Sequence, residues 1–308
     1  MTPDTDRETK FGFVALLGAP NAGKSTLLNR VVGSKLAIVT PKVQTTRTRM
    51  TGIAIIGQAQ IAFIDTPGIF APKRRLDRAM VAAAWSGMSD ADTSVLMVDA
   101  DRAAKAKGSI DPDSLNIIEG FKKSGSKVIL ALNKIDMVPR EQLLKVTEAH
   151  NETGVFAKIF MISATTGDGV DDLLDNLVSH LSVGPWHYPE DQLSDAPLRL
   201  LAAEITREQA FLQLHQELPY ALAVETDSWQ ERDDGSARID QTILIKRESQ
   251  KGMVVGKGGM RIKAISTAAR KEMIENFDRE IHLFLHVKVR DWMDKPDHYR
   301  EMGLNFKS

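Results

Sequence analysis

The segment Gly18-Ala-Pro-Asn-Ala-Gly23-Lys24-Ser25 decides the fold of the first part of this chain. It matches the pattern G-x-x-x-x-G-K-[ST], follows an apolar run at residues 13–18 and precedes a helical run at residues 25–32. In that context backbone N–H groups surround phosphates at a helix N-terminus, the lysine neutralises phosphate charge, and the serine hydroxyl binds magnesium. A glycine-rich turn with a surface lysine is the plain alternative, and the flanking strand and helix favour the phosphate loop.

Outward from this loop, strand-like and helical patterns alternate up to about residue 181. Apolar runs at residues 13–18, 59–65, 95–100, 127–133 and 160–163 read as strands separated by amphipathic segments. This alternation predicts an α/β P-loop domain over residues 11–181, with a mostly parallel sheet covered by helices on both faces. Residues 49–56 and 59–65, divided by Gly57-Gln58, predict a hairpin, so the sheet is expected to be mixed.

Length and composition exclude several classes of protein. The chain has 308 residues, enough for about two domains, and its 43% hydrophobic and 26% charged residues are typical of a folded protein. It has no cysteine, which excludes disulfide scaffolds, thiolate catalysis and cysteine zinc sites. Residues 1–10 form a polar tail without a signal-peptide pattern, and the longest uncharged stretch, residues 50–64, is too short to span a bilayer. We therefore expect a cytoplasmic protein.

Three further motifs stand at the ends of predicted strands. Asp65-Thr66-Pro67-Gly68 places a carboxylate where it can hold magnesium through water, and a glycine whose N–H can approach a γ-phosphate. Asn133-Lys134-Ile-Asp136 offers a carboxylate that can accept two hydrogen bonds from guanine, a pattern that adenine lacks. Ser163-Ala164 follows another apolar strand and can complete a base pocket, although alone it reads as a capping serine.

These four motifs, in this order, resemble the translation-factor-like GTPases over residues 11–181. The resemblance implies that residues 40–47 form the first switch, where either Thr45 or Thr46 binds magnesium together with Ser25 and Asp65. The predicted catalytic residues are Asn21, Lys24, Thr45, Thr46 and Gly68. The predicted GTP-binding residues are Gly18, Ala19, Pro20, Asn21, Ala22, Gly23, Lys24, Ser25, Thr26, Asp65, Thr66, Pro67, Gly68, Ile69, Asn133, Lys134, Asp136, Ser163 and Ala164.

Ile69 occupies the position after Gly68 at which Ras-like enzymes carry the glutamine that orients the attacking water. The resemblance implies that GTPases with a hydrophobic residue at this position orient the attacking water without a glutamine. It also implies that an asparagine at the place of Asn21 can hold potassium near the phosphates. We expect Mg²⁺ as cofactor and slow intrinsic hydrolysis that potassium stimulates.

The chain changes character near residue 182, and residues 182–197, with several prolines, predict a linker. Beyond it, residues 198–218 read as a helix, 220–227 and 237–246 as strands, 260–276 as a helix and 281–289 as a strand, which predicts an α+β domain over 198–308. The acidic stretch 227–234 reads as a solvated hairpin tip. The net charge of the chain is −1, yet residues 246–271 carry eight basic residues against one acidic residue.

Gly256-Lys-Gly-Gly259 lies inside this basic window, between two helical runs. A G-x-x-G loop of this kind lets a nucleic-acid backbone approach closely while flanking cations contact phosphates. The element order resembles the type II KH domain, and a GTPase domain followed by a KH domain resembles a family of bacterial ribosome-assembly GTPases. This resemblance implies GTP and GDP, the 3′ end of 16S ribosomal RNA and the 30S subunit as partners. The predicted RNA-binding residues are Lys251, Gly256, Lys257, Gly258, Gly259, Arg261 and Lys263.

Two other functions fit the sequence less well. An RNA-binding adaptor with an idle nucleotide site would explain Ile69, but intact Lys24, Ser25 and Asp65 disfavour it. A membrane-recruited GTPase is the second alternative, but the sequence shows no amphipathic basic helix that would bind a membrane. The resemblance allows weak peripheral association with the inner face of the cell membrane. We expect a monomer.

Overall fold

The computed structural model describes residues 8–40, 46–47, 50–72, 75–215, 218–290 and 292 of the chain. The chain divides into two compact units. The first unit comprises Met1–Ser34 and Thr46–Asp195, and the second comprises Lys35–Thr45 and Ala196–Ser308. In the described part of the chain, no helix combines the length and the apolar character needed to cross a membrane.

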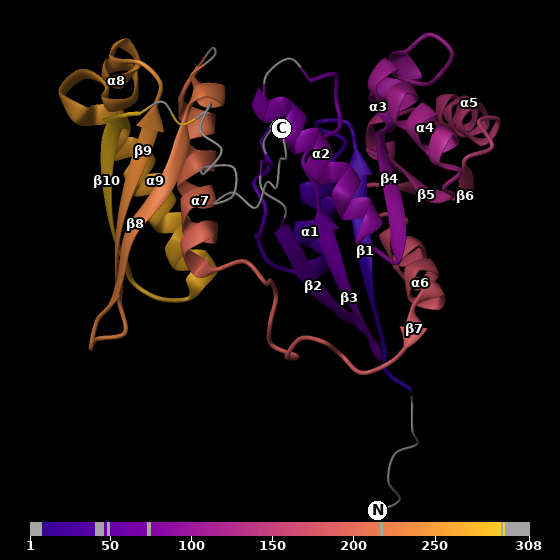
Figure 1. Ribbon diagram of the computed structural model, residues 1–308, viewed down its shortest axis with the longest axis horizontal. Coiled ribbons are helices and arrows are strands. Elements are labelled where there is room, and N and C mark those ends of the chain that lie inside the picture. The colour runs from indigo at the N-terminus through magenta and orange to yellow at the C-terminus, as the bar shows by residue number, and fades with distance from the viewer. Residues whose placement is uncertain are drawn as a thin grey trace, which may run out of the picture. The chain divides into compact units, whose positions relative to one another are not determined.

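The first unit is built around a mixed sheet in the strand order β2-β3-β1-β4-β5-β6, with β7 paired to β1 (Figure 1). β1, β3, β4, β5 and β6 run parallel, and β2 and β7 are antiparallel to their neighbours. The strands are β1 (Lys10–Gly18), β2 (Met50–Ile56), β3 (Ala59–Asp65), β4 (Thr93–Asp99), β5 (Val128–Asn133), β6 (Phe156–Ile162) and β7 (Ser182–Val183). The mostly parallel mixed sheet expected from the sequence is confirmed.

Helices cover this sheet because its central strands are apolar on both faces. Ala15 and Leu17 of β1 join a buried cluster with residues of α2 to α5, while Val14 and Leu16, on the opposite face, are also fully buried. α1 packs against β2, and α6 packs against β6. The helices are α1 (Lys24–Val32), α2 (Arg75–Ser89), α3 (Ala100–Lys105), α4 (Pro112–Ser124), α5 (Arg140–Asn151) and α6 (Val170–His180), with a 3₁₀ turn at Ile135–Met137.

Residues 182–195, most of the stretch expected to be a linker, are tied to the first unit. Gln60, a fully buried side chain of β3, accepts hydrogen bonds from the backbone N–H groups of His187 and Tyr188, both at 3.0 Å. The His187 ring stacks on Phe11 with ring centroids 3.9 Å apart. Further along, the N–H of Ile53 donates to the carbonyl of Leu193 at 2.8 Å. This segment therefore follows the β1–β3–β2 side of the sheet.

The second unit is a three-stranded sheet with helices along it (Figure 1). The strand order is β10-β9-β8, with β10 parallel and β8 antiparallel to β9. Its strands are β8 (Ala223–Glu231), β9 (Ala237–Ile245) and β10 (Ile281–Val289), and its helices are α7 (Leu198–Gln213), α8 (Glu248–Val255) and α9 (Met260–Phe277), with 3₁₀ turns at Pro219–Ala221 and Lys257–Gly259. The α+β arrangement expected for this part is confirmed.

Several element boundaries differ from the expectation. In the first unit, β1 and β6 begin earlier than expected, at Lys10 and Phe156 instead of residues 13 and 160. α7 ends at Gln213, because Leu214 is extended and Pro219 begins a separate turn, so the helix does not reach residue 218. β8 runs to Glu231, so residues 227–231 are strand and the hairpin tip is restricted to about residues 232–236. The strand continues through this polar stretch because Trp229 packs edge-on against Phe277 of α9, with ring centroids 5.9 Å apart.

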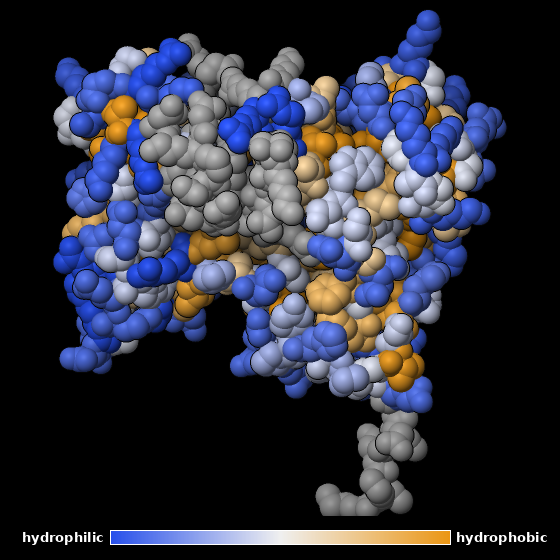
Figure 2. All heavy atoms as spheres, in the orientation of Figure 1, coloured by the Kyte–Doolittle hydropathy of each residue, from blue (hydrophilic) through white to orange (hydrophobic). Residues whose placement is uncertain are grey.

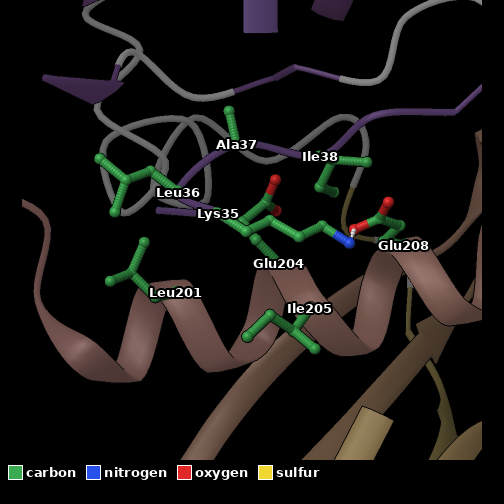
Figure 3. A pocket seen from close by; sticks show the side chains of 8 residues that line it. All are labelled: Lys35, Leu36, Ala37, Ile38, Leu201, Glu204, Ile205 and Glu208. Atoms are coloured by element: carbon green, nitrogen blue, oxygen red, sulfur yellow. Dashed lines mark ion pairs between the residues drawn. The ribbon is translucent and has the colours of Figure 1, made fainter. Parts of the chain in front are cut away.

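Residues 35–38 lie against α7 within the second unit (Figure 3). Leu36, Ala37 and Ile38 are buried, and with Lys35 they line a small pocket facing Leu201, Glu204, Ile205 and Glu208. The Lys35 ammonium pairs with Glu208 at 2.9 Å and also with Glu272 of α9. The side chains of the two carboxylates are only 4% and 12% exposed, so one lysine serves two nearly buried charges.

Replacing Lys35 by methionine should destabilise the second unit by about 1–3 kcal/mol, because two buried carboxylates lose their cation. The midpoint of urea unfolding measures the change. Lys271→Met is the matched control, since Lys271 pairs with Glu275 at 3.8 Å on an exposed surface, where we expect less than about 0.5 kcal/mol. Adding Glu208→Gln to Lys35→Met should restore part of the loss, and an unchanged midpoint for Lys35→Met would show that the cluster is solvated.

Candidate functional site

The phosphate loop joins β1 to α1 through two glycines that cannot be replaced without strain. Gly18 has φ 147°, and a Cβ atom there would lie 2.3 Å from the carbonyl oxygen of Met97. Gly23 caps α1 with φ 97°, and its Cβ would lie 2.1 Å from the side-chain nitrogen of Asn133. Both positions require glycine because the backbone passes against neighbouring strands in left-handed conformations. The turn they form brings the N-terminus of α1, with its unpaired N–H groups, to the end of the sheet.

Lys24 and Asp65 are buried side by side at this turn. The Lys24 ammonium donates to the carbonyls of Gly18 at 3.1 Å and Ala19 at 3.0 Å, so the loop's own oxygens hold it. Burial lowers the pKa of Lys24 to about 8, although the nearby Asp65 opposes this shift. Burial likewise raises the pKa of Asp65, with Lys24 and hydrogen bonds from Ser25 and Thr46 opposing the shift. Each charged form is therefore poorly solvated where it stands.

Three side-chain oxygens converge beside this pair. Ser25 Oγ donates to Asp65 Oδ2 at 2.9 Å, and Thr46 Oγ1 lies 2.9 Å from Ser25 Oγ and 3.3 Å from Asp65 Oδ2. The other carboxylate oxygen, Asp65 Oδ1, is buried without a hydrogen-bond partner among the described residues. Hydroxyl and carboxylate oxygens are the ligands that Mg²⁺ prefers, so this donor set fits a magnesium ion. Thr45, the other candidate threonine, lies outside the described residues.

Hydrogen bonds hold the Asp65–Ile69 segment against the end of β1 and the start of the phosphate loop. The Thr66 hydroxyl donates to the carbonyl of Leu16 at 2.7 Å, and the N–H of Ile69 donates to the carbonyl of Gly18 at 3.0 Å. A Cβ atom on Gly68 would lie 2.9 Å from Pro20, so the two loops touch at this glycine. The Ile69 side chain is buried in the core cluster and is not available to orient water.

Asn133 links the predicted base pocket to the phosphate loop. Its side-chain amide donates to the carbonyl of Ala22 at 2.8 Å, and its oxygen accepts from the N–H of Ala164 at 2.8 Å. The structure thus brings Asn133 and Ala164 to the phosphate loop, as the motif order predicts. Asp136 is exposed in the following turn, so its carboxylate is accessible to a base.

The G-x-x-G loop of the second unit lies between α8 and α9. Gly256 and Gly258 have φ 73° and 58°, and a Cβ atom on Gly256 would lie 2.7 Å from Arg261. Val254 and Ile265, one on each flanking helix, are fully buried in the same core cluster and anchor the loop from both sides. The loop is therefore a fixed turn whose outer face carries no side chain at Gly258.

Basic side chains surround this loop in accessible positions. Figure 2 shows mostly hydrophilic surface at the end of the second unit where α8 lies. Arg261 donates to the carbonyl of Met253 at 2.7 Å, which fixes its guanidinium beside the loop. The predicted RNA-binding cations are all exposed, namely Lys251, Lys257, Arg261 and Lys263.

Two contacts at the nucleotide site were missed by sequence reasoning. Lys134 pairs with Asp99 at 2.5 Å, and Asp99 could have been noticed as a carboxylate that ends an apolar strand. Arg30 of α1 donates to the carbonyls of Ala164, at 2.6 Å, and Thr165. No local pattern marks Arg30, because its partners lie more than 130 positions further along the chain.

Nucleotide binding should draw a proton onto Lys24 in mildly alkaline solution. The pKa of about 8 in the free protein rises when phosphates surround the ammonium, so affinity for GDP should fall with pH above about 8, approaching tenfold per pH unit. Calorimetric titrations between about pH 7 and pH 9, in two buffers of different ionisation enthalpy, give both the affinity and the proton uptake. Lys24→Arg, whose side chain stays protonated, should bind more weakly but without this dependence. A flat profile for the unmodified protein would contradict the assignment.

Two family models match the chain. One, described as 50S ribosome-binding GTPase, covers residues 13–134, and the other, a KH domain, covers residues 217–293. The first match contains the phosphate loop and the Asp65–Gly68 and Asn133–Lys134 segments. The second contains the G-x-x-G loop and the three strands around it.

Known proteins match over nearly the whole length. GTPase Era of Rhizobium meliloti (strain 1021) is 58% identical over 299 residues, which is 97% of this chain and 94% of that protein. A structure of an Aquifex aeolicus Era variant bound to GDP and AlF4⁻ superposes with a TM-score of 0.89 at 37% identity, covering 97% of this chain and 100% of that one. A structure of Era with MgGDPNP and nucleotides 1506–1542 of 16S ribosomal RNA gives the same score, identity and coverage. On this similarity, which includes both the nucleotide site and the G-x-x-G loop, the chain belongs to the Era family of GTPases.

Proposed function

We propose that this protein hydrolyses GTP with magnesium and binds the 3′ end of 16S ribosomal RNA through its KH domain during assembly of the 30S subunit. The observation that carries the proposal is the convergence of the Ser25, Thr46 and Asp65 oxygens beside Lys24, in a chain that also carries an exposed basic G-x-x-G loop. An Era structure with MgGDPNP and 16S ribosomal RNA supports the choice of both ligands.

In this proposal magnesium is held by Ser25 and Thr46 directly and by Asp65 through water, and it neutralises charge on the β- and γ-phosphates. Asp65 Oδ1, which accepts no hydrogen bond from any described residue, supports a site built for a hydrated cation. Lys24 leaves the carbonyls of Gly18 and Ala19 for the phosphate oxygens, which gives the buried ammonium anionic partners. The N–H groups of the phosphate loop and of Gly68 donate to the phosphates, and Asp136 selects guanine.

Thr46, rather than Thr45, is the magnesium ligand in this account. Thr46→Ala should slow single-turnover GTP hydrolysis by about a hundredfold and raise the magnesium concentration needed for half-maximal rate, because a hydroxyl ligand is lost. Thr45→Ala is the control and should change both quantities by less than about threefold. If Thr45→Ala shows the larger defect, the assignment is wrong, and if neither variant slows hydrolysis, neither threonine is a magnesium ligand that the reaction needs. Phosphate release by the unmodified protein no faster than by Lys24→Ala would favour the adaptor function.

Water for the attack needs a positioning group other than Ile69, and we propose potassium at Asn21. Asn21 is exposed in the phosphate loop with φ 64°, so its side chain is accessible to an ion beside the phosphates. Hydrolysis should be at least about tenfold faster in potassium than in sodium buffer at equal ionic strength, and Asn21→Ala should abolish the difference. Equal initial rates in the two buffers would remove potassium from the account.

RNA binding is proposed for the face around Gly258. The absence of a Cβ there lets a phosphodiester backbone come close, while Lys251, Lys257, Arg261 and Lys263 neutralise phosphates. We propose that the nucleotide state changes RNA affinity through residues 41–50 and 68–78. The coupling is reciprocal, so RNA then strengthens GTP binding by the same factor. We further propose that the protein acts as a cytoplasmic monomer, with at most weak peripheral membrane association.

An oligonucleotide copying the 3′ end of 16S ribosomal RNA tests this proposal. Binding should be tighter with a GTP analogue than with GDP or without nucleotide, and should weaken steeply as salt rises from about 50 to 200 mM. Gly258→Asp should reduce affinity by at least about tenfold by adding a carboxylate against the phosphates, whereas Gly235→Asp, in the hairpin turn of the same unit, is the matched control. Binding that ignores the nucleotide would favour the adaptor function, and no binding would exclude this RNA.

A further inference from the structure

The loop after β6, which we assign to the guanine base, is stiff within itself. The N–H of Ser163 donates to the carbonyl of Asp168 at 2.9 Å, and the N–H of Gly167 donates to the carbonyl of Ser163 at 2.8 Å. The N–H of Thr166 donates to Ser163 Oγ at 3.1 Å. Because these bonds close the loop on itself, its position depends on contacts made from outside it.

Two side chains supply such contacts at the same residue. Asn133 accepts from the N–H of Ala164 at 2.8 Å, and Arg30 Nε donates to the carbonyl of Ala164 at 2.6 Å. The guanidinium also donates through Nη2 to the carbonyl of Thr165. Ala164 is therefore held through both of its backbone polar groups, from β5 on one side and from α1 on the other.

Together with the phosphate loop, these contacts link α1, β5 and the loop after β6 to one another. Asn133 also donates to the carbonyl of Ala22 in the phosphate loop, and that loop continues into α1, the helix that begins at Lys24 and carries Arg30. Arg30 thus connects the helix that bears the phosphate-binding lysine to the loop that faces the base. A displacement of either part relative to the other breaks bonds to charged or buried groups.

The local geometry suits arginine in particular. A guanidinium presents adjacent N–H groups in a planar fork, which matches two successive carbonyl oxygens, whereas a lysine ammonium is a single point donor. Gly167, with φ 102°, leaves room for the fork, because a Cβ atom there would lie 2.8 Å from Arg30 Nη1. The space at Gly167 and the two donated bonds are separate observations that point to the same role.

We propose that Arg30 is a positioning residue that fixes the guanine loop to the phosphate-binding helix and thereby sets how long the nucleotide stays bound. The inference rests on the proposed assignment of Ser163 and Ala164 to the base pocket. Arg30 touches neither phosphate nor base in this account, so it governs affinity and leaves the chemical step unchanged.

The experiment compares Arg30→Met and Arg30→Lys with Arg140→Met, an exposed arginine of the same unit, in the full chain. Stopped-flow release of a fluorescent GDP analogue should be about tenfold faster for Arg30→Met, equivalent to about 1.4 kcal/mol, intermediate for Arg30→Lys and unchanged for Arg140→Met. Single-turnover hydrolysis at saturating MgGTP should stay within about twofold of the unmodified protein. Affinity for tripolyphosphate, measured by competition, should not change, because that ligand has no base.

Three results would overturn the proposal. These are an unchanged release rate in Arg30→Met, an equal loss of affinity for tripolyphosphate and GDP, which would indicate a general structural defect, and a slower chemical step with unchanged release. The base-pocket assignment has its own control, because Asp136→Asn must weaken GDP binding without weakening tripolyphosphate binding. If that control fails, the guanine site is misassigned independently of Arg30.

Discussion

The nucleotide site of this GTPase depends on one buried carboxylate beside one buried ammonium. Asp65 ends β3 and Lys24 begins α1, and burial disfavours the charged form of each. Within the described part of the chain, Asp65 Oδ1 has no hydrogen-bond partner, and the Lys24 ammonium donates to the loop carbonyls of Gly18 and Ala19. In the function proposed above, phosphates would contact Lys24 and a hydrated magnesium ion would contact Asp65, which would compensate the poor solvation of both groups. Burial thus removes solvation from Lys24 and Asp65 in the protein without ligand.

The motifs that the sequence predicts well are those whose conformation is locally required. Gly18 and Gly23 lie against neighbouring strands in left-handed conformations, so their spacing, together with the apolar run before them and the helical run after them, predicts the loop. The succession of strands along the chain is also predicted from the sequence, because apolar runs and turn residues alternate. Three features could not be read from sequence. Trp229 extends β8 by packing on Phe277, Asp99 pairs with Lys134, and Arg30 reaches residues far along the chain. Each depends on contacts between segments that only the folded chain brings together.

The described residues between α1 and Thr46 belong partly to each unit. The chain leaves the first unit after Ser34 and returns to it at Thr46. Lys35, at the start of this excursion, is held by two nearly buried carboxylates, and Thr46, at its end, contacts Ser25 and Asp65. Lys35 and Thr46 are therefore each held in place by polar side chains.

We propose that burial beside Lys24 leaves the Asp65 carboxylate poorly solvated until a ligand binds. Replacement by the neutral asparagine tests it, with thermal unfolding measured with and without MgGTP. At neutral pH the raised pKa of Asp65 means that its ionised form costs folding free energy, so Asp65→Asn should raise the Tm of the nucleotide-free protein. The same variant should lose the stabilisation that magnesium adds to GTP binding. A lower Tm without nucleotide, or undiminished stabilisation by MgGTP, would contradict this account.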